Sequence, residues 1–138
     1  MIRARVAGTG SYIPEKVLTN LDLEKFLDTS DEWIVTRTGI RERHIAAVDE
    51  NTSDLASEAA RQALQMAGVG AEEIDLIVVG TVTGEFNFPS TACLVQKNLN
   101  ARRAFAFDVS AACSGFLFAL SNAVNYHRSG AVKRSLVI

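Results

Sequence analysis

The sequence contains few of the residues that build metal sites or disulfide frameworks. Its 138 residues include only two cysteines, Cys93 and Cys113, and two histidines, His44 and His127. Two cysteines do not make the dense framework of a small secreted disulfide domain, and neither belongs to a C-x-x-C pair. Both histidines are distant from the cysteines in sequence, so we expect no metal site.

The sequence also lacks an excess charge of one sign and a long apolar run. Its formal net charge is −2 at pH 7, whereas a general nucleic-acid-binding protein usually has a basic excess. No apolar run approaches the roughly 20 residues that cross a bilayer. Gly8, Gly10 and Pro14 interrupt the segment where a signal peptide would be apolar. We therefore expect a cytoplasmic protein that binds neither nucleic acid nor membrane.

What is present is a globular composition in which strand and helix patterns alternate. Hydrophobic residues make up 48% of the chain and charged residues 22%, as in an ordinary folded domain. Strands are predicted over residues 3–9, 40–47, 74–79, 104–109 and 135–138. Helices are predicted over residues 21–27, 31–38, 53–67, 89–99 and 113–128.

Two of these segments indicate the fold class. The continuous apolar run from Ile74 to Val79 favours a parallel strand covered on both faces. The helix before it carries an alanine-rich stripe that permits close approach to a sheet. The apolar strand at 135–138 needs a neighbouring strand for its backbone groups, so we expect the chain to continue beyond it. The prediction is an α/β layered fold with a mixed, mostly buried sheet flanked by helices.

Cys113 is the residue with the clearest chemical context. It stands in the segment 108–116, between a predicted buried strand and a predicted buried helix. Unpaired amides and the dipole at a helix N-terminus favour the thiolate. A thiolate attacks a thioester with little further activation, because the leaving group is also a thiolate. The Cys113 amide can serve as one oxyanion donor. For an isolated cysteine, however, packing in the core is the commoner role.

Longer motifs decide between these two interpretations. Residues 29–44, TSDEWIVTRTGIRERH, resemble the signature of the β-ketoacyl-acyl-carrier-protein synthase III family. Residues 8–14, GTGSYIP, residues 111–116, AACSGF, and Phe88-Pro89-Ser90 resemble the same family, in the same order. The resemblance implies a thiolase-like fold of two similar halves. Residues 1–138 would be the N-terminal half, which carries the nucleophilic cysteine, and the C-terminal half would be absent from this chain.

The resemblance also implies the reaction. Such enzymes transfer an acyl group from acyl-coenzyme A to the cysteine, here Cys113. They then decarboxylate malonyl-acyl carrier protein, and the resulting carbanion attacks the acyl-enzyme, which initiates fatty-acid synthesis. The coenzyme A thioester is a substrate, so no cofactor is expected. The enzymes are homodimers, which adds a second copy to the expected partners.

The same resemblance assigns binding roles to four residues. Trp33 would stack on the adenine of coenzyme A, Thr29 and Arg37 would contact the nucleotide, and Phe88 would line the acyl pocket of the partner subunit. Trp33 and Arg37 are four residues apart and so share a face of the predicted helix. An aromatic face beside a guanidinium suits an adenine and a phosphate. Without the motif, Trp33 would more often cover a core.

The family's catalytic histidine and asparagine belong to the second half, and no motif here matches either. His127 follows Cys113 by fourteen residues, which is about 21 Å along a helix, so it cannot replace them. We therefore expect this chain to need the C-terminal half for condensation.

Two alternative interpretations stay open at this point. Another thiolase-fold enzyme, such as a hydroxymethylglutaryl-coenzyme A synthase or a plant-type polyketide synthase, would share the nucleophilic cysteine, although the motif at 29–44 favours the type III synthase. A non-catalytic assembly half would pair with a partner chain through an unfinished sheet. A dinucleotide-binding site is excluded, because Gly8-x-Gly10 lacks the third glycine and Pro14 stands where a helix should begin.

Overall fold

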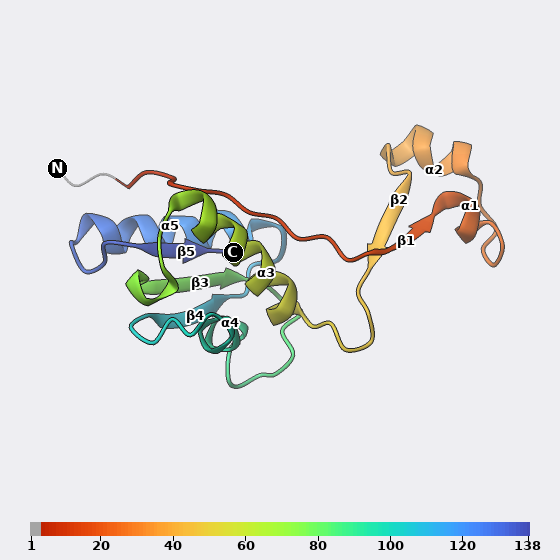
Figure 1. Ribbon diagram of the computed structural model, residues 1–138. Helices are drawn as coiled ribbons and strands as arrows, with labels where there is room; N and C mark the ends of the chain where they lie inside the picture. The colour runs from red at the N-terminus through yellow and green to blue at the C-terminus, as the bar shows by residue number, and fades with distance from the viewer. Residues whose placement is uncertain (1–3) are drawn as a thin grey trace. The chain divides into compact units, whose positions relative to one another are not determined.

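The structure, a computed structural model, describes residues 4–138 and comprises two compact units (Figure 1). The larger unit combines the N-terminal segment through Tyr12 with residues 51–138, and the smaller unit comprises residues 13–50. In the part of the chain that is described, no helix is both long enough and apolar enough to span a bilayer.

A three-stranded parallel sheet forms the centre of the larger unit. Its order is β4-β3-β5, with β3 at Leu76–Gly80, β4 at Phe105–Val109 and β5 at Ser135–Val137. Residues 76–79 are all buried, which confirms the prediction of a parallel strand covered on both faces. The strand begins two residues later than predicted, because Ile74 still closes the 3-10 turn at Ala71–Glu73.

Helices cover both faces of this sheet (Figure 1). On one face, α3 (Thr52–Ala67) and α4 (Thr91–Leu99) share a core with Ile77 and Val79 of β3. On the other face, α5 (Gly115–Arg128) contributes small alanine side chains to a second core. Successive residues of a strand point to opposite faces, so β3 supplies side chains to both cores.

Local signals explain where these helices begin and end. Ser90 is the N-cap of α4 and accepts a hydrogen bond from the Cys93 amide. Gly68 ends α3 in the left-handed conformation, with φ of 64°, as predicted. Two predicted starts are corrected by a residue or two. The N-cap of α3 is Asn51, and Pro89 precedes the N-cap of α4 instead of lying in its first turn.

The predicted strand at 3–9 is wrong over residues 4–9, and its first residue lies outside the described residues. This segment runs against α3. A Cβ on Gly8 would collide with the backbone of Ala63, and a Cβ on Gly10 with that of Ala59. The glycines permit a close approach to a helix, and a helix surface offers no ladder of backbone groups to pair with.

The smaller unit pairs β1 (Lys16–Thr19) antiparallel with β2 (Glu42–Ile45), within the strand predicted over 40–47. It also contains α1 (Asn20–Leu23) and α2 (Asp31–Thr38). Strand β1 was not predicted. The N-cap of α1 is Thr19, and α1 is shorter than the helix predicted over 21–27. In contrast, α2 follows the prediction at both ends, with Ser30 as N-cap and Gly39 in the left-handed conformation.

A buried asparagine connects the elements of the smaller unit. Asn20 is 1% exposed. Its side-chain amide donates to Asp31 Oδ1 and to the Ile40 carbonyl, both at 2.8 Å, and its Oδ1 accepts from the Arg43 guanidinium. Among the residues described in this unit, Ile34 is the one buried apolar side chain. Polar contacts of Asn20 therefore hold together a unit that has little apolar core.

Candidate active site

The thiol of Cys113 lies exposed in the turn that joins β4 to α5. This 3-10 turn spans Ala112–Ser114, and α5 begins directly after it at Gly115. The prediction placed Cys113 at the first position of the helix, whereas α5 begins two residues later, at Gly115. Within residues 4–138, the thiol therefore does not fill a core. The position remains next to the positive end of the α5 helix dipole.

The backbone of this turn adopts an uncommon conformation. Ala112 has a φ of 44°, in the left-handed region that side chains other than glycine seldom occupy. Directly after the turn, Gly115 packs against the end of β3. A Cβ on Gly80 would lie 2.7 Å from the Gly115 carbonyl carbon. The tight contact between these two glycines fixes the start of α5 on the sheet. Strained backbone held in place by its surroundings is typical of functional turns.

Phe88, the predicted acyl-pocket residue, lies in the loop that connects β3 to α4 in the same unit. Its side chain is 89% exposed. Where this loop enters α4, the carboxylate of Asp108 accepts hydrogen bonds from the amides of Thr91, at 2.8 Å, and Ala92, at 2.7 Å. Asp108 belongs to β4, the strand that leads to Cys113. Sequence reasoning assigned no role to Asp108, because its partners lie 16 and 17 residues away along the chain.

The other three predicted binding residues lie together in the smaller unit. The guanidinium carbon of Arg37 lies 4.4 Å from the centroid of the Trp33 ring, so the two residues share a face of α2 as predicted. Trp33 is 52% exposed and therefore does not cover a core. Thr29 and Trp33, with Asp28 and Ser30, line a depression of about 440 Å³. An exposed indole under a cation can stack on a flat heterocycle.

Histidine is not placed beside the thiol within the larger unit. Nε2 of His127 lies 2.9 Å from the Ser135 hydroxyl, and His127 belongs to the last turn of α5, whereas Cys113 precedes its first turn. In residues 4–138, no group of three potential ligands among histidine, cysteine, aspartate and glutamate is arranged to hold a metal ion. The candidate site in this unit is thus a single exposed thiol on a fixed turn.

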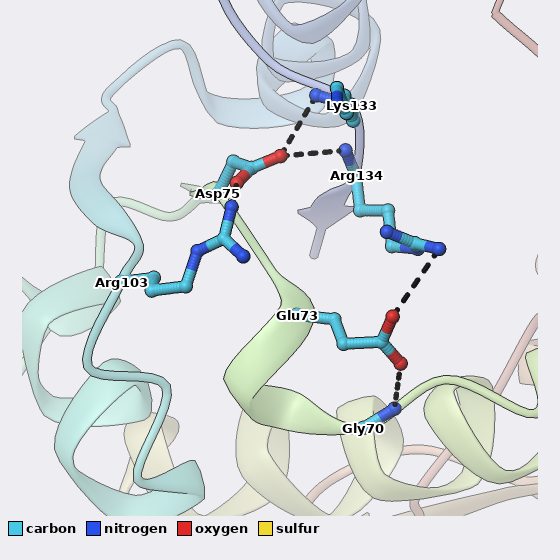
Figure 2. Close-up of polar contacts among 6 residues, drawn as sticks. All are labelled: Gly70, Glu73, Asp75, Arg103, Lys133 and Arg134. Atoms are coloured by element: carbon cyan, nitrogen blue, oxygen red, sulfur yellow. Dashed lines mark hydrogen bonds and ion pairs between the residues drawn. The ribbon is translucent and has the colours of Figure 1, made fainter.

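Where the three parallel strands begin, the side chain of Asp75 contacts the segments that precede β4 and β5 (Figure 2). Asp75 accepts hydrogen bonds from the amides of Lys133, at 2.8 Å, and Arg134, at 3.1 Å. It also forms an ion pair with Arg103 at 2.5 Å. Burial raises the pKa of Asp75, but the two amides and Arg103 outweigh it and leave this pKa below its ordinary value. These contacts align the starts of the three strands of the parallel sheet.

Comparison with known proteins adds an independent finding. The sequence model of the family described as 3-oxoacyl-[acyl-carrier-protein (ACP)] synthase III matches residues 107–138, a stretch that includes the Cys113 turn. The chain is 62% identical over 99% of its length to the β-ketoacyl-[acyl-carrier-protein] synthase III of Xanthomonas campestris, of which it covers 42%. It is 63% identical to the protein of the same description from Xylella fastidiosa, again covering 42%. The chain thus spans about two fifths of the length of these relatives.

Solved structures give the same result. The crystal structure of 3-oxoacyl-[acyl-carrier-protein] synthase III from Aquifex aeolicus superimposes with a TM-score of 0.92 at 53% identity. The match covers 95% of this chain and 42% of that one. The family resemblance inferred from the motifs and the prediction of a layered, thiolase-like α/β fold are therefore both confirmed.

Proposed function

We propose that the chain is the N-terminal portion of a β-ketoacyl-acyl-carrier-protein synthase III and that it carries the nucleophile of an acyltransferase. The whole enzyme condenses acyl-coenzyme A with malonyl-acyl carrier protein in the cytoplasm and thereby initiates fatty-acid synthesis. The observation that supports this function most directly is the exposed Cys113 thiol, held on a strained turn at the start of α5.

The proposed reaction has two steps at the same sulfur atom. The Cys113 thiolate attacks the carbonyl carbon of acyl-coenzyme A, the bond to the coenzyme A sulfur breaks, and coenzyme A leaves as a thiolate. Backbone amides around the turn are suited to stabilise the developing oxyanion. Malonyl-acyl carrier protein then loses carbon dioxide. The carbanion that remains attacks the acyl-Cys113 carbonyl, which releases the Cys113 thiolate and the β-ketoacyl product.

We assign the coenzyme A nucleotide to α2. Trp33 would stack on the adenine, and Arg37 and Thr29 would contact the phosphates and ribose. The exposed indole beneath the Arg37 guanidinium and the adjacent depression support this assignment. Phe88 would line the acyl pocket, which its exposed position in the β3–α4 loop allows.

The outer face of α5 supports a requirement for a second half of the fold. One face of α5 packs on the sheet through Ala119 and Ala123. Phe116, Leu117 and Phe118 point elsewhere and are 54%, 65% and 54% exposed. Consecutive residues point to different sides of a helix, so these three side chains expose apolar surface around the start of α5, as at an interface. We propose that residues 1–138 are the N-terminal thiolase-like half, and that the C-terminal half covers this face and supplies the catalytic histidine and asparagine.

A homodimer is part of the same proposal. In the described residues, β4 has a strand neighbour on one side only, and exposed strand edges are usually covered in natural proteins. A second copy of the chain is a suitable cover, because the resemblance implies a dimer whose acyl pocket takes Phe88 from the partner subunit.

A reconstitution assay tests the proposed function. The protein is incubated with acetyl-coenzyme A and malonyl-acyl carrier protein, alone and with the C-terminal portion of the Xanthomonas campestris relative. Acetoacetyl-acyl carrier protein is measured by mass spectrometry. We expect product with the added portion and none with Cys113→Ala under the same conditions. Stable association of the two portions without product or acyl-enzyme would favour the assembly role, for which the exposed α5 face is the supporting observation.

A further inference from the structure

The loop between β3 and α4, residues 81–90, is fastened at its first half to the start of α3. The Thr52 hydroxyl donates to the Thr83 carbonyl at 2.7 Å, and the Ser53 amide donates to Glu85 Oε1 at 2.7 Å. Burial raises the pKa of Glu85, but hydrogen bonds from Ser53 outweigh it and leave this pKa below its ordinary value. Glu85 is thus an ionised anchor at the positive end of a helix.

The second half of the loop is fastened by Asp108. This residue pairs with Val79 in the sheet, and its neighbours Phe107 and Val109 pack in the core on the α5 side. Strand alternation therefore directs Asp108 towards α4. Each of its carboxylate oxygens accepts one of the first two amides of α4. Two consecutive charge-assisted hydrogen bonds constrain the orientation of that helix start more tightly than a single bond would.

Between these anchors lies an exposed aromatic segment, residues 86–89, which we call the loop tip. Phe86 is 62% exposed and Phe88 is 89% exposed. Helix α4 begins two residues after the last residue of the loop tip, and Asp108 precedes Cys113 by five residues. The Asp108 carboxylate therefore connects the helix start that follows the loop tip with β4, the strand that leads to Cys113.

We propose that Asp108 is a positioning residue that fixes the loop tip on the sheet, and that the placement of this tip sets which acyl chains fit the acyl pocket of the partner subunit. This inference rests on the proposed function, which assigns the acyl group to Cys113 and places Phe88 in the acyl pocket of the partner subunit. Asp108 itself need not touch the substrate. It acts through the orientation of the first turn of α4 and through the loop that this turn terminates.

Asp75 provides a matched control within the same sheet. Like Asp108, it is an aspartate at one end of the sheet whose carboxylate accepts two consecutive backbone amides (Figure 2). It differs in position. Asp75 lies where the strands begin, whereas Asp108 lies near the end of β4, from which the chain continues to Cys113. Asp108→Asn leaves one acceptor oxygen for two amides that each had their own. Asp75→Asn leaves one acceptor oxygen for two amides that already share Oδ2, and it removes the Oδ1 acceptor of Arg103. Loss of stability alone therefore affects both variants.

The experiment compares the original protein, Asp108→Asn and Asp75→Asn at a temperature well below the unfolding midpoint of the weakest variant. The first measurement is the rate of Cys113 acylation by acetyl-coenzyme A relative to hexanoyl-coenzyme A, with and without the C-terminal portion used above. The second is the rate of Cys113 alkylation by iodoacetamide relative to the larger N-phenylmaleimide, followed by peptide mass spectrometry. Alkylation requires no acyltransferase activity.

We expect Asp108→Asn to change both ratios, the acyl-chain ratio by roughly tenfold, because small misplacements of a positioned group have effects of this size or larger. Asp75→Asn should keep the ratios of the original protein. If Asp108→Asn matches Asp75→Asn in both ratios, the positioning role is wrong. If no variant is acylated but the alkylation ratio changes only in Asp108→Asn, the proposed function fails and the positioning role stands.

Discussion

The guanidinium of Arg37 lies 4.4 Å above the indole of Trp33, one helical turn away on α2. Since Trp33 is the only tryptophan of the chain, its fluorescence reports on this contact alone. The pair leaves half of the indole accessible, which is the arrangement expected for a residue that stacks on a ligand and not for one that fills a core.

We predict that coenzyme A quenches the Trp33 fluorescence, and that Arg37→Gln weakens binding about five- to thirtyfold, equivalent to about 1–2 kcal/mol. Titration of the fluorescence with coenzyme A measures the dissociation constant directly. Phe26→Ala is the matched control, because Phe26 is an exposed aromatic residue of the same unit, 65% exposed. Equal affinities for all three proteins would contradict the assignment of α2 to the nucleotide.

Close contact between Gly80 and Gly115 predicts a second effect. In Gly80→Ala, the new Cβ would lie within 3 Å of the Gly115 carbonyl carbon, so the start of α5 must shift. We expect a loss of about 1–3 kcal/mol of unfolding free energy and slower acylation of Cys113. Gly39→Ala is a suitable control, because a Cβ on Gly39 meets no atom within 4 Å although its φ is 73°. It should lose stability while Cys113 keeps its reactivity.

The depressed pKa of Asp75 predicts how stability depends on pH. A carboxyl group whose pKa is lower in the folded protein stabilises it above the unfolded value, near 3.9, and this contribution is lost as the pH falls through the folded value. Asp75→Asn should therefore lower the unfolding free energy by about 1–3 kcal/mol at pH 7. The difference between the two proteins should shrink below about pH 4. Urea unfolding from pH 7 to pH 2 measures it, and a constant difference would contradict the role of the Asp75 charge.

The polar centre of the smaller unit gives a fourth prediction. Asn20→Ala removes the partner of Asp31, the Ile40 carbonyl and Arg43 in a unit with little apolar core. We expect a loss of about 2–4 kcal/mol, since several buried polar groups lose their partners together. Hydrogen exchange should accelerate in residues 13–50 and stay unchanged in the parallel sheet. Uniform acceleration across both units would contradict the local role of Asn20.

Local signals explain why parts of the fold were predictable from the sequence. The start of α2 at Ser30 and its end at Gly39 depend on caps within a few residues. The burial of β3 follows from one uninterrupted apolar run. The segment over residues 4–9 was predicted wrongly, because its neighbour is the alanine-rich face of α3, 50 or more residues away along the chain.

The candidate site was likewise predictable where its signals are local and not where they depend on distant segments. The motifs located Cys113, and the spacing of Trp33 and Arg37 placed them on one helix face. The anchors Asp108 and Asp75 could not be found in this way. Each carboxylate accepts hydrogen bonds from backbone amides of distant segments. Every residue except proline has such an amide, so the residue types of the partners do not reveal these contacts.

The most direct test of the central claim is intact-protein mass spectrometry after incubation with acetyl-coenzyme A, with and without the C-terminal portion of the Xanthomonas campestris relative. Cys93→Ser and Cys113→Ala distinguish the two thiols, of which Cys93 is half-buried and Cys113 exposed. We predict one acetyl adduct that persists in Cys93→Ser and disappears in Cys113→Ala. Folded protein that gains no adduct in either condition, or an adduct that survives Cys113→Ala, would contradict the role of Cys113 as the acyl carrier.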